Sequence, residues 1–171
     1  KKQVFKEIFR VLKPGGELYF SDVFSGRRVP QELKDDPVLY GECLGGALYI
    51  EDFRRMLISL GCFDYRVIAK KRIKVDSPKL KAKCQGIDFY SFTIRLFKLA
   101  LEDICEDYGQ SVVYSGTMPG HPHQFILDDH HIFIANKQML VCGNTADMLE
   151  KSRYGKYFKI NGDKSTHFGA F

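Results

Sequence analysis

The chain lacks any long run of apolar residues, which argues against a membrane protein. Its longest apolar stretches fall far short of the ~20 residues that a membrane-spanning helix needs. The opening residues, KKQVFKEIFRVLK, are charged and amphipathic, so they do not supply the uninterrupted apolar stretch of a signal peptide. We therefore expect a cytoplasmic protein that does not interact with a membrane.

The sequence also lacks a C-x-x-C pair, and this bears on the role of its five cysteines. An odd number of widely spaced cysteines favours neither a disulfide framework nor a tetrahedral zinc site. Reduced thiols in a reducing compartment fit the pattern better. The cysteines are Cys43, Cys62, Cys84, Cys105 and Cys142.

What the sequence does contain is the composition of an ordinary globular protein. Of its 171 residues, 44% are hydrophobic and 27% are charged. This is enough for one domain, or one and a half small ones, with a sizeable core. We find no internal repeat and no low-complexity tract.

The net charge of +5 is spread along the chain, apart from one basic cluster, AKKRIKV, at residues 69–75. Such a cluster either binds phosphate or nucleic acid, or forms the solvated face of an edge strand. The second interpretation is favoured because Ile73 and Val75 alternate with charged residues. We therefore expect no nucleic-acid partner.

The first part of the chain predicts a helix followed by a buried strand. Residues 3–12 have apolar side chains at helical spacing, and KPGG at 13–16 ends the helix. GELYFSDVF at 16–24 has the apolar and aromatic content of a strand in a sheet covered on both faces. This order predicts a mixed or parallel sheet. The helical stripe comprises Val4, Ile8, Val11 and Leu12.

A second helix and a pair of strands follow. Residues 25–48 predict irregular structure, and residues 50–61 predict a helix that ends at Gly61. Residues 63–75 and 89–99 predict two strands that pair antiparallel. Between these strands, residues 76–86 predict a connector with room for a short helix.

The character of the sequence changes around residues 100–110, where LEDICEDYGQ is acidic and ends in a glycine turn. We place a boundary there. The remainder predicts a small antiparallel meander with one helix and a tail strand. Its strand segments are SVVYSGTM, QFILD, HIFIA, QMLVCG and YFKI, and its helix is TADMLEKS at 145–152.

Two stretches resemble the C-terminal part of a class I methyltransferase that depends on S-adenosylmethionine. FKEIFRVLKPGGELYFSDVF resembles the segment leading into the fifth strand of that fold. The helix ending in SLGCF and the strand pair after it resemble the final helix and the sixth and seventh strands. This resemblance concerns the fold and leaves the substrate open.

The resemblance narrows at GECLGGALY, which is similar to the arsenic-binding loop of arsenite methyltransferases. FTIRLFK, YSGTMPGH, FILD and EKSRYGKYF also resemble that family, so the similarity covers essentially the whole chain. It implies that residues 1–100 are the C-terminal part of a doubly wound α/β sheet, with an arsenic-binding loop at about 40–49. Residues 105–171 would then be the small α+β C-terminal domain of the family.

The sequence departs from the family in one respect, because no G-x-G-x-G occurs in it. The resemblance places the glycine-rich S-adenosylmethionine loop, and the other arsenic-binding cysteines, before the position of Lys1. We therefore expect the C-terminal half of an enzyme, inactive and without measurable S-adenosylmethionine binding when alone. Its first strand is expected to have an unpaired edge.

Only Cys43 carries over from the family, as both catalytic residue and arsenic(III) ligand. Trivalent arsenic is soft and binds thiolates. Three thiolates would dehydrate it and aim its lone pair at the methyl group of S-adenosylmethionine. The implied substrates are arsenite and methylarsenite, with glutathione or thioredoxin as reductant. We interpret Gly41, Gly45 and Gly46 as allowing the loop to close on arsenic.

Purely structural roles also remain possible for the same residues. A lone cysteine such as Cys43 is often a small buried apolar residue. Glu42 either tunes the electrostatics of the site or is an exposed acid. We expect Cys62 and Cys142 to pack, and Cys84 and Cys105 to be exposed thiols in connectors.

The histidines and the segment KSRYGKYF at 151–158 also allow two interpretations. Histidines beside Asp128 and Asp129 suggest a metal site, but their spacing matches no established motif and favours surface loops. The basic, aromatic segment at 151–158 would suit RNA, although packing of a helix terminus on the meander is favoured. The histidines are His121, His123, His130 and His131.

Two rival functions also stay open at this point. One is a class I methyltransferase acting on another small molecule. The other is a non-catalytic, truncated module that binds a soft metalloid or a protein through its thiols.

Overall fold

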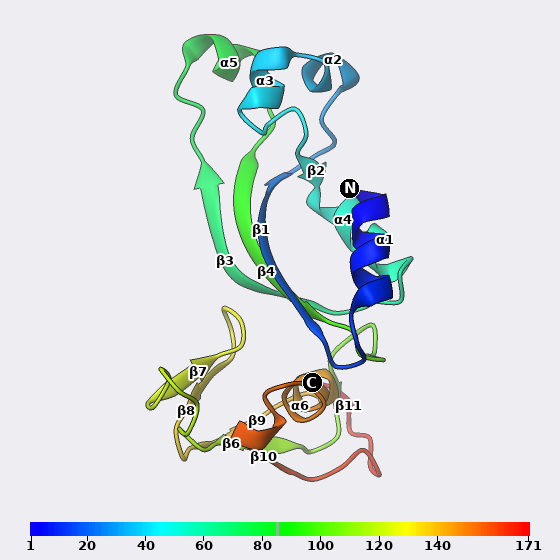
Figure 1. The fold of residues 1–171 in the computed structure, drawn as a ribbon, viewed down its shortest axis with the longest axis vertical. Helices are drawn as coiled ribbons and strands as arrows, with labels where there is room; N and C mark the ends of the chain where they lie inside the picture. Colours follow the sequence, from blue (N-terminus) through cyan, green and yellow to red (C-terminus); the bar gives the residue numbers. More distant parts are fainter. Residues whose placement is uncertain (85) are drawn as a thin grey trace.

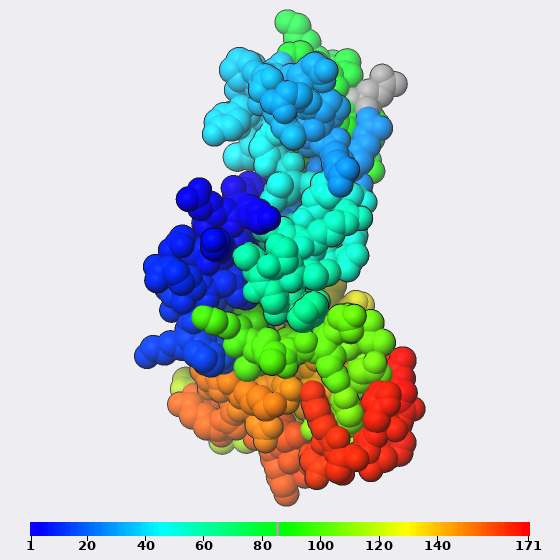
Figure 2. Space-filling model, turned by 90° about the vertical axis from the view of Figure 1, so that its right-hand side faces the viewer, coloured from blue at the N-terminus to red at the C-terminus, as the bar shows by residue number. Residues whose placement is uncertain are grey.

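The computed structural model describes residues 1–84 and 86–171, which form an elongated molecule with a curved sheet at its centre (Figure 1). Small helices cap one end of this sheet, and the C-terminal part, residues 105–171, lies at the other end. The space-filling view shows the same separation of the two ends (Figure 2). In the described ranges, no helix has both the length and the apolar character to cross a membrane.

The central sheet has the strand order β2-β1-β4-β3 and is mixed. β4 (Phe89–Phe97) lies between β1 (Glu17–Ser25) and β3 (Tyr65–Ile73) and pairs antiparallel with both. This confirms the predicted antiparallel pair. The short strand β2 (Leu48–Tyr49) runs parallel to the end of β1.

Two helices, α1 (Lys2–Val11) and α4 (Ile50–Ile58), cover one face of the sheet (Figure 1). Both were predicted, but α1 does not use the expected stripe: it buries Phe5 and Phe9, while Val4 is 60% exposed and Val11 is 65% exposed. The phenylalanine rings meet Phe53 of α4 and residues of the sheet in one aromatic core. On the other face of β1, Tyr19 is exposed, so the expected cover on both faces is incomplete.

The basic segment lies on β3, which is an edge strand of the sheet. The guanidinium of Arg72 pairs with Asp88. The ammonium of Lys70 lies 4.6 Å from the centre of the Tyr90 ring. The interpretation of this segment as a solvated strand edge is therefore confirmed.

The segment 25–48, predicted to be irregular, contains two single-turn helices, α2 (Gln31–Lys34) and α3 (Pro37–Gly41). The connector at 76–86 contains α5 (Pro78–Lys83), and its Gln85 lies outside the described residues. The three helices enclose a small core at the end of the sheet. Its buried members include Val29, Leu39, Leu44, Ala47, Cys84, Ile87 and Phe89.

The C-terminal part contains the predicted short strands and helix, arranged around β6 (Ser111–Tyr114). β6 lies between β10 (Phe158–Asn161) and β9 (Gln138–Leu140), so the order β10-β6-β9 is not that of the chain. β7 (Gln124–Ile126) and β8 (Ile132–Ile134) form a separate hairpin, and β5 (Glu106–Asp107) pairs with β11 (Gly169–Ala170). The helices are α6 (Gly143–Glu150) and the 3-10 turn η1 (Gly155–Tyr157).

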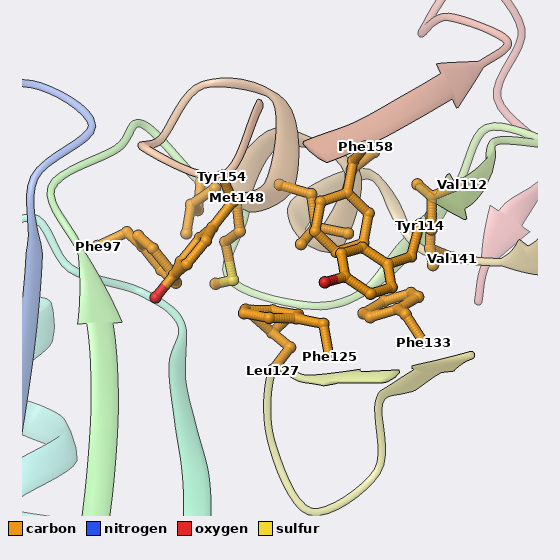
Figure 3. Close-up of a cluster of buried hydrophobic side chains, with 13 residues drawn as sticks. Phe97, Val112, Tyr114, Phe125, Leu127, Phe133, Val141, Met148, Tyr154 and Phe158 are labelled. Atoms are coloured by element: carbon orange, nitrogen blue, oxygen red, sulfur yellow. The ribbon is translucent and has the colours of Figure 1, made fainter. Parts of the chain in front are cut away.

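An aromatic core holds the C-terminal part together (Figure 3). The ring centres of Tyr114 and Phe158 lie 5.0 Å apart, and those of Phe125 and Tyr154 lie 4.7 Å apart. Phe97, at the end of β4, belongs to the same core and contacts Tyr154. The long central strand therefore enters the core of the C-terminal part.

Candidate functional site

Cys43 lies two residues after the end of helix α3, and local sequence explains why that helix forms. The side chain of Asp36 accepts hydrogen bonds from the backbone N–H groups of Val38 (3.0 Å) and Leu39 (3.1 Å). Pro37 occupies the first helical position, where its missing N–H is no loss. Lys83 of α5 pairs with the same carboxylate, which ties the two helices together.

The turn that ends α3 places Cys43 in the left-handed backbone region, with φ at +63°. The N–H of Cys43 donates to the carbonyl of Tyr40 (3.0 Å), and those of Leu44 and Gly45 both donate to the carbonyl of Leu39 (2.9 Å). Glycine usually occupies this position after a helix. A residue with a Cβ there costs about 1–2 kcal/mol.

The three glycines around Cys43 differ in their surroundings. A Cβ at Gly45 would lie 2.9 Å from the carbonyl oxygen of Leu33, so a close backbone approach requires glycine at that position. A Cβ at Gly41 or Gly46 would meet nothing within 4 Å. Only Gly45 is therefore needed for packing.

The Cys43 side chain is exposed, and the turn that carries it is anchored on both sides. Leu44 and Ala47 are buried in the core beneath the helices. The backbone N–H groups of residues 42–45 all donate hydrogen bonds. The predicted loop at 40–49 is a tethered turn between α3 and β2. Glu42 is exposed.

The turn lies near the carboxyl end of β1. Phe24 and Ser25 at that end pair in parallel with Leu48 and Tyr49, just after the turn. In open α/β sheets, ligands bind beyond the carboxyl ends of parallel strands. The cap that holds Cys43 is also at the opposite end of the sheet from the C-terminal part (Figure 1). An exposed thiol is therefore available at the edge of the sheet where a substrate would be expected.

Two of the remaining cysteines are sequestered. Burial raises the pKa of the Cys62 thiol to about 12, and its S–H donates to the carbonyl of Asp64 (3.5 Å). Cys84 was expected to be exposed, but α5 folds it into the core of the cap, where burial raises its pKa. Neither thiol is available to a substrate.

The other two cysteines have the expected exposure. Cys105 is exposed and Cys142 is buried. The sulfur of Cys142 lies 3.3 Å from Oγ1 of Thr145 in α6.

The cluster of histidines and aspartates has a structural role. Nδ1 of His131 lies 2.8 Å from Oδ1 of Asp128, and Asp128 pairs through its other oxygen with Arg66 of β3 (3.2 Å). His130 is exposed. No group of three or more histidine, cysteine or acidic side chains suited to a metal ion occurs within 1–84 or 86–171.

The SRY segment packs against the central sheet instead of projecting into solvent. The hydroxyl of Tyr154 donates to Glu17 of β1 (2.8 Å), and Arg153 pairs with the same carboxylate (2.8 Å). Nε of Arg95 on β4 lies 2.7 Å from its other oxygen. The expected packing of this helix terminus on the strands of the C-terminal part is seen in the contact of the Tyr154 ring with Phe125 of β7. The contacts with the central sheet were not predicted, and we call Glu17, Arg95, Arg153 and Tyr154 the Glu17 clamp.

Comparison with known proteins places the chain in one family. The arsenite methyltransferase C-terminal domain matches residues 108–169. The chain is 49% identical to an arsenite methyltransferase of Aquipseudomonas alcaligenes, over 100% of this chain and 50% of that protein. The human arsenite methyltransferase is 35% identical over 94% of this chain and 42% of its own length.

A solved structure agrees with these relatives. It is that of an arsenic(III) S-adenosylmethionine methyltransferase from Chlamydomonas reinhardtii, and the TM-score is 0.94 at 48% identity. The match covers 99% of this chain and 57% of the other. The chain spans about half the length of the curated relatives that it matches.

Proposed function

Because this chain belongs to the arsenite methyltransferase family, whose C-terminal portion it spans, we propose that the parent enzyme methylates trivalent arsenic with S-adenosylmethionine. Arsenite and methylarsenite are its substrates. Residues 1–100 complete the methyltransferase sheet and supply the arsenic-binding turn. Residues 105–171 are the C-terminal domain.

The observation that carries this proposal is the exposed thiol of Cys43 in a left-handed turn. A strained backbone position that persists where glycine would fit better suggests a function for the side chain. Thiolate sulfur is the ligand that a soft ion such as arsenic(III) prefers. Cys43 is therefore the arsenic ligand contributed by this chain.

The tethered turn suits a ligand that must orient its substrate. S-adenosylmethionine supplies a methyl group on a sulfonium centre. The Cys43 thiolate, together with thiolates from the rest of the enzyme, would replace the hydroxyl groups of arsenite and fix the direction of its lone pair. The anchored backbone of residues 42–45 fixes the position of one of the thiolates that would bind arsenic.

The supporting roles follow from the same chemistry. A thiol reductant such as glutathione or thioredoxin would return the methylated arsenic to its trivalent state. All five cysteines of the chain are free thiols. This agrees with a cytoplasmic, reducing location for the enzyme.

The test is the Cys43→Ser variant of the complete enzyme. Loss of the thiolate should abolish arsenite methylation, measured as methylated arsenic formed from labelled S-adenosylmethionine. Cys62→Ser is the matched control, because that thiol is buried, and it should retain turnover. Wild-type turnover in the Cys43→Ser enzyme would remove Cys43 from the site. Methyl transfer that does not need arsenite would point to another substrate.

A further inference from the structure

A cavity of about 670 Å³ lies between the central sheet and the C-terminal part. Tyr19 of β1 and Arg95 of β4, which are partners across the two strands, line it from the sheet. Phe125 of β7 and residues of the segment 153–157 line it from the C-terminal part. The cap that holds Cys43 is at the opposite end of the sheet (Figure 1). The volume of the cavity is in the range of sites for one small molecule.

The lining of this cavity is positively charged. Arg95, Arg153 and Lys156 line it, and no acidic side chain does so among the described residues. Glu17 is buried next to the two arginines, and its carboxylate pairs with both of them. With His121 of the lining counted as neutral, three cations and one carboxylate leave two positive charges. This charge matches a dianion such as a phosphate monoester near neutral pH.

The three cations differ in how freely they can meet a ligand. The Arg95 side chain is 9% exposed, and its Nη1 donates to two backbone carbonyls at the end of β7 (2.7 and 3.1 Å). Arg95 is therefore a fixed charge in the wall of the cavity. The Arg153 side chain is 71% exposed and pairs through Nη2, so its Nε and Nη1 make no hydrogen bond to the described residues. Lys156 is exposed and has no ion pair in the described chain. Arg153 and Lys156 are therefore available to an anion.

Aromatic rings lie beside these charges. The guanidinium carbon of Arg95 is 5.3 Å from the centre of the Tyr19 ring, and Nζ of Lys156 is 4.9 Å from the centre of the Tyr157 ring. Tyr19 is 52% exposed, so its ring is accessible to a ligand. Tyrosine rings stack on flat bases, and arginine and lysine bind phosphate. A ligand with both a ring and a phosphate would use both features of the cavity.

We propose that this cavity binds a small phosphate monoester with a flat ring, of the nucleoside monophosphate class. Arg153 and Lys156 bind the phosphate, and Tyr19 stacks on the ring. Arg95 adds fixed positive charge from the wall. The proposal is independent of the proposed arsenic chemistry, because it involves no thiol.

A strand of RNA presents the same groups, but the cavity favours a small molecule. A groove for single-stranded nucleic acid has cations that follow the backbone over several nucleotides. Here the three cations line one cavity of the size of a single ligand. A phosphate monoester also has about two negative charges, whereas each phosphodiester of a strand has one.

The experiment titrates the 171-residue chain with AMP, adenosine and inorganic phosphate in isothermal titration calorimetry at low salt. We expect one site for AMP, because only AMP has both the ring and the dianion. Its affinity should exceed that of adenosine or phosphate by about tenfold or more, the gain from one charge-assisted hydrogen bond. Added salt should weaken AMP binding, since charge contributes to it. An AMP affinity no higher than that of adenosine or phosphate would contradict the proposal.

Two variants test the residues. Lys156→Gln should weaken AMP binding by about tenfold, because it removes one charged contact with the phosphate. Tyr19→Val keeps a residue suited to a strand but removes the ring, so the advantage of AMP over phosphate should disappear. Lys159→Gln is the matched control, because Lys159 is exposed but does not line the cavity, and it should bind AMP as the wild type does.

Unchanged AMP binding in both Lys156→Gln and Tyr19→Val would place AMP elsewhere and overturn the proposal. A single-stranded RNA oligonucleotide that binds when AMP does not would identify a nucleic-acid interface instead. Lys156 and Tyr19 are both exposed, so their replacement should leave the fold intact. The methylation assay of the Cys43→Ser enzyme reads a different residue, so the two proposals can fail separately.

Discussion

At the scale of single residues, the backbone conformation at Cys43 suits glycine, although the residue at that position is a cysteine. The left-handed turn after α3 is a glycine position, yet the chain has a thiol there between an exposed acid and a buried leucine. Nothing in the packing requires that thiol, since it is exposed. The backbone strain at Cys43 should therefore lower the free energy of unfolding by a measurable amount.

Cys43→Gly should raise the free energy of unfolding relative to Cys43→Ala. Both variants remove the sulfur, but alanine keeps the Cβ that makes the left-handed conformation unfavourable. The gain should be up to about 1 kcal/mol, because the greater freedom of glycine in the unfolded chain offsets part of the relief. Urea unfolding of the two variants measures it. If the glycine variant is the less stable one, the turn is not strained.

A second prediction at this scale concerns Asp128, whose side chain is 3% exposed. Burial acts to raise its pKa, but His131, the N–H of His130 and Arg66 lower the pKa to about 2. A lowered pKa in the folded state contributes stability above the unfolded value, near 4. That contribution, on the order of 2 kcal/mol, should be lost as the pH falls from about 4 towards 2.

Asp128→Asn should therefore lose about 2–4 kcal/mol of stability at pH 7, because it also leaves the buried Arg66 without one of its carboxylates. The difference from wild type should shrink when unfolding is measured below pH 4. Asp129→Asn is the control, since that side chain is 44% exposed, and it should change little. A deficit at Asp128 that is independent of pH would refute the linkage.

At the scale of elements, the Glu17 clamp joins the first strand of the sheet to the end of α6. The Glu17 side chain is 6% exposed and receives Tyr154, Arg153 and Arg95 together. A Cβ at Gly15, in the turn before β1, would collide with the carbonyl oxygen of Lys151. The turn and the clamp therefore fix the same junction from two sides.

Tyr154→Phe should lower the free energy of unfolding by about 1–2 kcal/mol. It keeps the ring in the aromatic core but removes the hydroxyl that donates to the buried carboxylate. Tyr157→Phe is the matched control, because the Tyr157 hydroxyl makes no hydrogen bond to the described residues. Equal losses in the two variants, measured by urea unfolding, would show that the clamp contributes nothing beyond packing.

The elements also show how far sequence reasoning reaches. Periodicity and composition identified the existence of α1, α4, β1, β3 and β4, because each is long enough to show its pattern. It missed α2 and α3, since single-turn helices depend on local caps such as Asp36 and on the core beneath them. The position of Cys43 was predicted from a family motif, whereas its left-handed backbone could not be, because a cysteine rarely adopts it.

At the scale of the whole molecule, the contacts that join distant segments were the least predictable. No pattern in the sequence indicates that Glu17 meets Tyr154. α1 gives a related example, because both of its faces carry apolar residues. The face of α1 with Phe5 and Phe9 packs against the sheet. The face with Val4 and Val11 stays exposed. In the described structure, residues 17–23 of the neighbouring strand β1 pair with β4 on one side and with no strand on the other.

This exposed surface predicts how the 171-residue chain behaves in solution. Val4 and Val11 on α1 and the free edge of β1 together offer apolar contact and unpaired backbone groups, which favour association with a second copy. In sedimentation velocity, the sedimentation coefficient should rise with concentration. Val4→Lys combined with Val11→Lys should weaken that rise, whereas Val38→Lys, which changes an exposed valine near Cys43 at the other end of the sheet, should not. A wild-type chain that stays monomeric at all concentrations would show that this surface is not adhesive.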